Sequence, residues 1–227
     1  EADWEHTVSW IDCVAGSGRG IFMRANHAEV QQAAPQASRQ WRMPFVPPVS
    51  LVNTLTLKPF NQLYYQLKKK QSTTLQYYQD FFHPLDHLLE WNRMYGPQGF
   101  FQYQCVLPRA QGREGVQAML KQISRASQGS LLAVLKTFGD RPSVGMLSFA
   151  QPGVTLALDF TNQGDKTHKL LASLDDIVRD ARGRLYPAKD ARMPRALFEA
   201  GYPRLQEFTS HRDPGISSAM SRRLMGS

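Results

Sequence analysis

The order of strand-like and helix-like segments between residues 100 and 188 most constrains the fold of this chain. Apolar residues alternate along three of the segments and recur at helical spacing in two others. In order, these segments are a strand at 100–107, a helix at about 112–127, strands at 131–138 and 154–160, a helix at about 166–181 and a strand at 184–188. The order βαββαβ predicts an α+β fold: a ferredoxin-like antiparallel sheet with its helices packed on one face.

Alternation along the strands gives the predicted sheet two unlike faces. One face is apolar and is expected to lie under the helices; it carries Phe101, Tyr103, Cys105, Ala133, Leu135, Val154, Leu156, Leu158 and Phe160. The other carries Gln102, Gln104, Leu132, Val134, Lys136, Phe138, Thr155, Ala157 and Asp159. Burying a lysine or glutamine without a partner costs on the order of a few kcal/mol. The second face is therefore expected either to be solvated or to meet a ligand.

The N-terminal part has weaker patterns. Residues 6–13 and 20–24 are expected to form a β-hairpin with its turn at 15–18. Residues 29–48 contain several prolines and are expected to be irregular, and a helix is expected at 61–70. Leu85, Leu88, Leu89 and Trp91 recur at helical spacing, which predicts a short amphipathic helix that Gly96-Pro97 ends.

Residues 81–108 carry a specific motif, FFHPLDHLLEWNRMYGPQGFFQYQCVLP. This motif resembles the decaprenylphosphoryl-ribose 2′-oxidase family, FAD-dependent enzymes of the vanillyl-alcohol-oxidase superfamily. The resemblance continues through LKTFG at 135–139, LSF at 147–149, GRLY at 183–186 and AKD at 188–190. The family's N-terminal FAD-binding domain has no counterpart here, and the start, Glu1-Ala2-Asp3, is expected to be internal to a longer protein. By this resemblance, residues 1–184 form the substrate-binding (cap) domain, and residues 185–227 return to the FAD-binding domain.

The resemblance implies an oxidoreductase that oxidises a sugar hydroxyl by hydride transfer to FAD. Its substrate would be similar to a polyprenyl-phosphoryl ribose, a cell-wall arabinan precursor, and an epimerising reductase would be its partner. FAD would be bound mainly by the missing domain, so this chain alone is expected to lack FAD and to be inactive. Two alternatives stay open: an aldonolactone-type oxidase of the same superfamily, and a non-catalytic module that binds a phosphorylated lipid or sugar.

Two lysines carry the main functional expectations. By resemblance, Lys189 contacts the flavin and the substrate and is the catalytic residue, and Tyr186 lies beside the cofactor. The competing interpretation is that Lys136 and Lys189 are both ordinary surface lysines. A cation beside a flavin stabilises negative charge that grows during hydride transfer. The residues expected to bind substrate are Lys136, Gln104, Gln102, Thr155, Trp10, Tyr65, Phe82, Leu85, Leu132, Val134 and Phe138.

Three positions depart from the family pattern. Thr155 replaces an active-site asparagine, Ala157 replaces the reactive cysteine of some members, and Phe82 replaces a tyrosine. Because of the first two departures, the resemblance does not fix the exact substrate of this chain. His83 is a possible general base, but in a His-Pro turn it more often has a structural role.

Composition excludes several other classes. The two cysteines, Cys13 and Cys105, are too few for a zinc site and are expected to be buried reduced thiols, and His83 and His87 lack a third ligand, so no metal site is expected. No run reaches the roughly 20 apolar residues of a membrane span. The net charge of +8 and the run Lys68–Lys70 suit anionic partners. Without a nucleic-acid-binding motif, we expect a cytoplasmic protein with possible peripheral membrane contact.

The C-terminal tail is expected to contain an amphipathic helix at about 194–208. In the family this helix packs on the flavin domain. Without that domain, Leu197, Phe198, Tyr202 and Leu224 are expected to lose their cover. The tail is therefore expected to be mobile or to pack on a neighbouring molecule.

Overall fold

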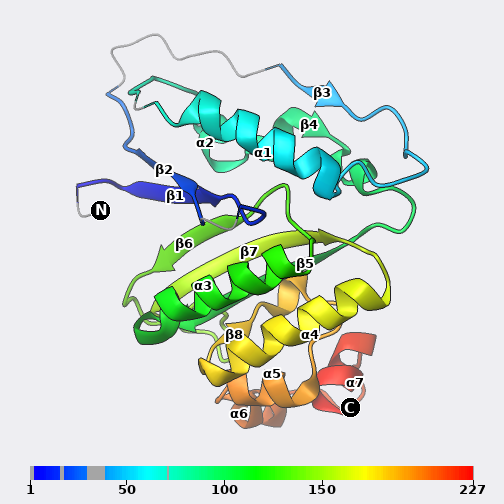
Figure 1. Ribbon diagram of the computed structural model, residues 1–227. Coiled ribbons are helices and arrows are strands. Elements are labelled where there is room, and N and C mark those ends of the chain that lie inside the picture. The colour runs from blue at the N-terminus through cyan, green and yellow to red at the C-terminus, as the bar shows by residue number, and fades with distance from the viewer. Residues whose placement is uncertain (1–2, 16–17, 30–38, 71, 227) are drawn as a thin grey trace.

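A computed structural model describes residues 3–15, 18–29, 39–70 and 72–226 (Figure 1). Its main sheet has six strands in the order β2-β1-β6-β7-β5-β8, and every neighbouring pair is antiparallel. The strands are β1 His6–Ile11, β2 Gly20–Ala25, β5 Phe100–Pro108, β6 Val134–Phe138, β7 Gly153–Thr161 and β8 Arg184–Leu185. Strands β5 to β8 have the order β6-β7-β5-β8, which confirms the predicted ferredoxin-like core.

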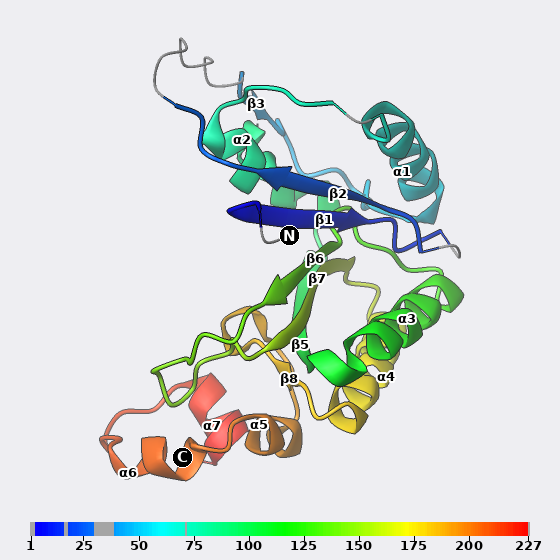
Figure 2. The same cartoon turned by 90° about the vertical axis from the view of Figure 1, so that its left-hand side faces the viewer.

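Helices α3 (Arg109–Arg125) and α4 (Asp165–Asp180) lie together on one side of this core (Figure 2). They cover the face that alternation predicts to be apolar. Cys105, Leu156 and Phe160 on this face are fully buried, as are Ile123 and Leu174 on the helices. Just beyond helix α4, Arg182 has a left-handed backbone conformation. Gly183 follows it, because a side chain at that position would meet the Val106 carbonyl oxygen.

The predicted hairpin of β1 and β2 is confirmed, and it extends the core at its β6 edge. Ser9 and Trp10 pair with Leu135 and Val134. Part of the expected turn at 15–18, namely residues 16 and 17, lies outside the described residues. Because Trp10 pairs with Val134, the polar face of the core continues onto β1.

The segment between the hairpin and β5 differs from expectation. Helix α1 (Thr54–Lys68) begins at Thr54 rather than at residue 61, because Asn53 and Thr56 form a capping box. The expected helix over 85–91 is wrong. In its place the chain forms α2 (Tyr78–Phe82), η1 (Pro84–His87), β4 (Leu88–Leu89) and η2 (Trp91–Tyr95). A left-handed Glu90 breaks helical continuity, and β4 pairs instead with the distant β3 (Trp41–Arg42).

The expectation of an uncovered tail is also wrong. The single helix expected at 194–208 is split into α5 (Arg195–Gly201) and α6 (Leu205–Ser210), and α7 (Ala219–Met225) follows. Leu197, Phe198, Tyr202 and Leu224 are all buried in the main core. The Tyr202 hydroxyl donates to the Leu185 carbonyl oxygen at 2.6 Å. The chain's own core therefore covers these side chains.

Candidate functional site

The polar face of the sheet brings several predicted site residues into direct register. Trp10, Val134, Ala157 and Gln104 are Cα partners in one row across β1, β6, β7 and β5. In the next row, Lys136 lies opposite Thr155. Successive rows on one face lie about 7 Å apart along the strands, so a ligand over this face can reach both rows.

Two amide side chains on this face are oriented by β7. The Gln104 Nε2 donates to the Thr155 hydroxyl at 3.1 Å, and the Gln102 Nε2 donates to an Asp159 carboxylate oxygen at 3.2 Å. Each bond uses one of the two N–H groups of the amide, which leaves one N–H and the carbonyl oxygen for a ligand. Sugar hydroxyls, which both donate and accept, match this arrangement.

Asp159 is a site residue that sequence reasoning did not single out. Its residue exposure is 8 %, and its backbone N–H donates to the Ser130 hydroxyl at 2.9 Å. Burial raises the pKa of its carboxyl, while the Gln102 hydrogen bond and the charge of Lys189 oppose that rise. The available sequence signal was an acidic residue within a strand of apolar neighbours.

Lys189 lies at the end of η3 (Pro187–Lys189), directly after β8. The side chain is half-buried, and its positive charge acts on Asp159. Across the described ranges 3–15, 18–29, 39–70 and 72–226, the Lys189 ammonium has no hydrogen bond or ion pair within the protein. It is therefore a cation beside the polar face whose donors can serve a ligand.

Three aromatic rings form a cluster that joins Tyr186, beside β5, to Phe138 at the end of β6. The Tyr186 backbone N–H donates to the Gln104 carbonyl oxygen at 2.9 Å, which joins the segment before Lys189 to β5. The Tyr186 ring stacks on Phe149 at 4.7 Å between centroids, and Phe149 meets the edge of Phe138 at 5.9 Å. Tyr186 and Phe138, both predicted as site residues, therefore belong to one aromatic cluster.

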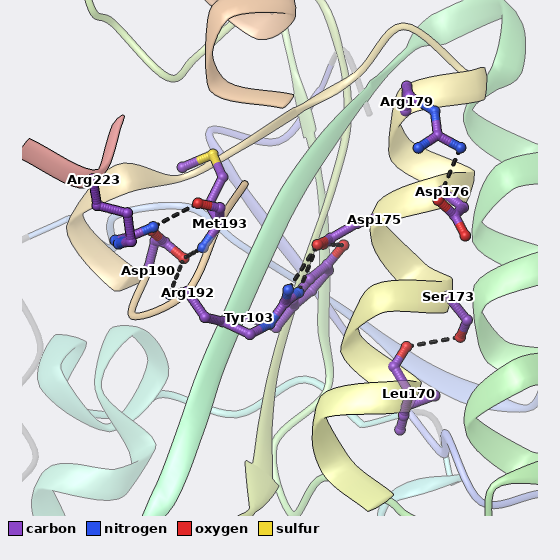
Figure 3. A network of polar contacts seen from close by, with 10 residues as sticks. All are labelled: Tyr103, Leu170, Ser173, Asp175, Asp176, Arg179, Asp190, Arg192, Met193 and Arg223. Atoms are coloured by element: carbon purple, nitrogen blue, oxygen red, sulfur yellow. Dashed lines mark hydrogen bonds and ion pairs between the residues drawn. The ribbon is translucent and has the colours of Figure 1, made fainter. Parts of the chain in front are cut away.

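A buried polar network holds the loop that follows Lys189 (Figure 3). The Asp190 carboxylate accepts from the backbone N–H groups of Arg192 and Met193 and from the Arg223 guanidinium of α7, the last at 2.8 Å. Arg192 in turn donates twice to Asp175 on α4, at 2.8 Å each. The loop is thus tied to two helices, which limits the positions that Lys189 can take.

Other predicted residues lie further from this register. The Phe82 ring packs on the edge of His6 at 4.9 Å, which places it over the same face of β1 as Trp10 but at the far end of that strand. Trp10 is buried, and the centroid of its ring lies 4.8 Å from that of Tyr64. The Tyr65 ring lies instead under the Arg19 guanidinium. Leu132 precedes β6 and Leu85 lies in η1, both half-buried. His87 contacts Asp80 at 3.1 Å, and His83 is exposed.

Two further features lie away from the polar face. Glu5, His6 and His27 bring possible metal-ligand atoms within 4.8 Å of one another at the start of the hairpin. A groove of about 350 Å³ lies between α3 and α4, lined by Gln122, Arg125, Ala126, Lys166, Lys169, Leu170 and Ser173. Because α3 and α4 cover the apolar face, this groove is not part of the candidate site.

An antiparallel sheet with helices on one face and a lysine-bearing polar opposite face is consistent with the substrate domain of an FAD-linked oxidase. The chain is 33 % identical over 241 aligned positions to the decaprenylphosphoryl-beta-D-ribose oxidase of Mycolicibacterium smegmatis. The alignment covers 99 % of this chain but 52 % of that oxidase, so the chain spans about half the length of this relative. The resemblance to the decaprenylphosphoryl-ribose oxidase family is therefore confirmed along nearly the whole chain.

A second relative is a Streptomyces coelicolor protein described as an uncharacterized protein in the mprA 5′ region. It is 32 % identical over 133 residues, which cover 56 % of this chain and 35 % of that protein. No family model matches the chain.

Proposed function

We propose that this chain forms the substrate-side wall of an FAD-dependent oxidoreductase that oxidises a hydroxyl of a phosphorylated, lipid-linked sugar. The observation that carries the proposal is the placement of Lys189, a cation without a partner within the described residues, beside Asp159 on the polar face that also carries Gln104, Thr155 and Lys136. The relative named decaprenylphosphoryl-beta-D-ribose oxidase supports the substrate class. An epimerising reductase that consumes the keto product stays a prediction from the resemblance.

The chemistry of the face fits one edge of a flavin. An ammonium group with free donors and an adjoining aromatic ring, Tyr186, suit the electron-rich edge of the isoalloxazine. When bound, FAD would supply the acceptor for a hydride from the carbinol carbon. Lys189 would stabilise the negative charge that grows beside it, an electrostatic contribution that is larger in the transition state than in the ground state.

The remaining residues of the face would hold the substrate. Gln102 and Gln104 would bind sugar hydroxyls through the amide groups that their bonds to β7 leave free. Lys136, exposed on β6 opposite Thr155, would pair with the phosphate. The apolar residues Val134 and Ala157 lie between Trp10 and Gln104 in their row and would contact the sugar ring.

Lys189→Ala tests this proposal in a longer protein that contains this chain and binds FAD. We expect the variant to keep its fold and its FAD, while flavin reduction at saturating substrate slows on the order of 10²–10³-fold. Stopped-flow absorbance measures that rate. Lys166→Ala on α4, an exposed lysine on the other side of the sheet, is the matched control and should reduce its flavin at the wild-type rate.

Two outcomes would refute the proposal in different ways. Reduction of Lys189→Ala at the wild-type rate would make Lys189 an ordinary surface lysine. A longer protein that purifies without flavin absorbance, and yet binds the phosphorylated sugar, would instead favour the non-catalytic binding module.

A further inference from the structure

One long stretch of the chain contains basic residues but no acidic ones. Residues 30–79 contain no aspartate or glutamate, although the chain has 19 such residues. The basic residues of the stretch are Arg39, Arg42, Lys58, Lys68, Lys69 and Lys70. Its charge is therefore entirely positive over 50 consecutive residues.

The same stretch holds most of the large hydrophobic side chains that the protein exposes. Among the described residues, 11 of the 15 exposed large hydrophobics lie between 41 and 78. They are Trp41, Phe45, Val46, Val49, Leu51, Leu55, Phe60, Leu63, Leu67, Leu75 and Tyr78. Exposed apolar side chains at this density mark an interaction surface rather than a random solvent-facing surface.

Helix α1 organises the outward face of this stretch. Phe60, Leu63 and Leu67 recur at helical spacing, and their exposed fractions are 46 %, 60 % and 69 %. The neighbouring side of the helix is anchored, because Leu57 is buried and Tyr64 packs on Trp10. The helix is thus held along one side and presents an apolar stripe, Phe60, Leu63 and Leu67, next to it, with the exposed Leu55 in its first turn.

The position of the stripe leaves it accessible to a large flat partner. Helix α1 lies beyond the β1–β2 hairpin, at the end of the molecule opposite α5, α6 and α7 (Figure 2). The run Lys68–Lys70 follows at its C-terminal end, and all three lysines are exposed. Among the residues that the structure describes, no helix is both long enough and apolar enough to cross a membrane.

We propose that α1 and its lysine run form a docking surface for an anionic lipid bilayer. An apolar stripe beside a cluster of lysines is the pattern of an interfacial helix, whose leucines enter the headgroup boundary while its lysines meet anionic lipids. A second copy of the chain fits this surface less well. A two-fold interface would place the lysine run against its own copy, without an acidic residue in the stretch to compensate. The inference does not rest on the proposed oxidoreductase function.

Vesicle co-sedimentation of the full chain tests the inference. We expect binding to vesicles of phosphatidylcholine mixed with phosphatidylglycerol, and much weaker binding to phosphatidylcholine alone. Replacing Lys68, Lys69 and Lys70 together with glutamine should weaken partitioning on the order of 10²-fold, and added salt should weaken the wild type similarly. The double variant Leu63→Gln/Leu67→Gln should weaken it on the order of tenfold. Both variants change exposed side chains, so their thermal unfolding should match the wild type.

Matched controls separate this surface from general charge and hydrophobicity. Lys121→Gln/Lys166→Gln/Lys169→Gln removes three exposed lysines of α3 and α4, and Val144→Gln/Ile216→Gln removes two exposed apolar side chains elsewhere. Both controls should bind vesicles as the wild type does. Equal losses in test and control variants, or unchanged binding in either test variant, would overturn the inference. It would also be overturned if Leu63→Gln/Leu67→Gln dissociated a dimer on gel filtration and left vesicle binding unchanged.

Discussion

Arg192→Met is expected to destabilise the protein strongly through a single buried charge. Asp175 on α4 is 5 % exposed and receives both Arg192 bonds, at 2.8 Å each, on one carboxylate oxygen. Its other oxygen accepts from the Tyr103 hydroxyl at 3.2 Å. Methionine keeps most of the side-chain volume of Arg192 but removes all its donors. The variant therefore leaves a buried carboxylate with one neutral partner.

The size of the effect follows from the burial of this pair (Figure 3). The Arg192 and Asp175 side chains are 18 % and 7 % exposed, so solvent screens them little. Removing one partner of a buried ion pair costs about 3–5 kcal/mol, because the remaining charge stays desolvated. For a protein of 227 residues this corresponds to a fall in Tm of roughly 6–20 °C.

The loss should also depend on pH, with a defined sign. Burial raises the pKa of the Asp175 carboxyl, and the Arg192 hydrogen bonds and charge oppose that rise. Without Arg192 the folded-state pKa moves further above the unfolded value. A carboxyl with a raised folded-state pKa favours the folded state while it is protonated, and this contribution is lost as pH rises through that pKa. The difference in unfolding free energy between wild type and Arg192→Met should therefore be larger near pH 8 than near pH 4.5.

Urea unfolding at the two pH values, followed by circular dichroism, measures this difference. The control is Arg179→Met, whose ion pair with Asp176 lies on the same helix with side chains 59 % and 60 % exposed. That variant should lose less than about 0.5 kcal/mol at either pH. The reasoning would be refuted if both variants lost the same stability, or if the loss in Arg192→Met were greater at the lower pH.

Three further predictions concern the cofactor, the substrate and the thiols. The chain by itself should purify without FAD, and stoichiometric flavin absorbance would contradict this. In an FAD-containing longer protein, Lys136→Ala should raise KM roughly tenfold with little change in kcat, because Lys136 would bind substrate and transition state alike. Steady-state kinetics beside Lys166→Ala would contradict this if kcat fell while KM stayed at the wild-type value. Burial raises the pKa of Cys13 to about 11 and of Cys105 to about 12. At pH 8 about one Cys13 thiol in a thousand is then ionised, and fewer for Cys105, so rapid labelling of the folded protein by a disulfide reagent would contradict the structure.

The sheet and its polar face could be predicted because their signals are local. A period of two along 100–107 and 154–160 fixes which side chains share a face, and the structure has the same division. The segment before β5 could not be predicted in this way. Leu88 and Leu89 have helical spacing with Leu85 and Trp91, yet their partners on β3 are more than 40 residues away in the chain. A left-handed Glu90 carries no clear sequence signal.

The tail was harder to predict for a related reason. Its apolar residues were recognised, but sequence alone does not say which surface covers them, and the chain's own core does so. Asp159 was placed on the polar face but not among the site residues, because a single acid in a strand has no period. Its role emerges only when Gln102 from β5 and Lys189 from beyond β8 are placed beside it. Both omissions concern contacts between segments far apart in sequence.

The contacts of the tail also bear on the candidate site. Arg223 of α7 reaches Asp190, the residue directly after Lys189, and also donates to the Met193 carbonyl oxygen at 2.6 Å. The same loop is fixed from the opposite side through Arg192 and Asp175. A lysine on a loop held at two points loses little conformational entropy when a ligand binds, and its charge is held in a fixed position beside the polar face. The packing of α7 on the core therefore helps to position Lys189 beside the polar face, although α7 contributes no residue to that face.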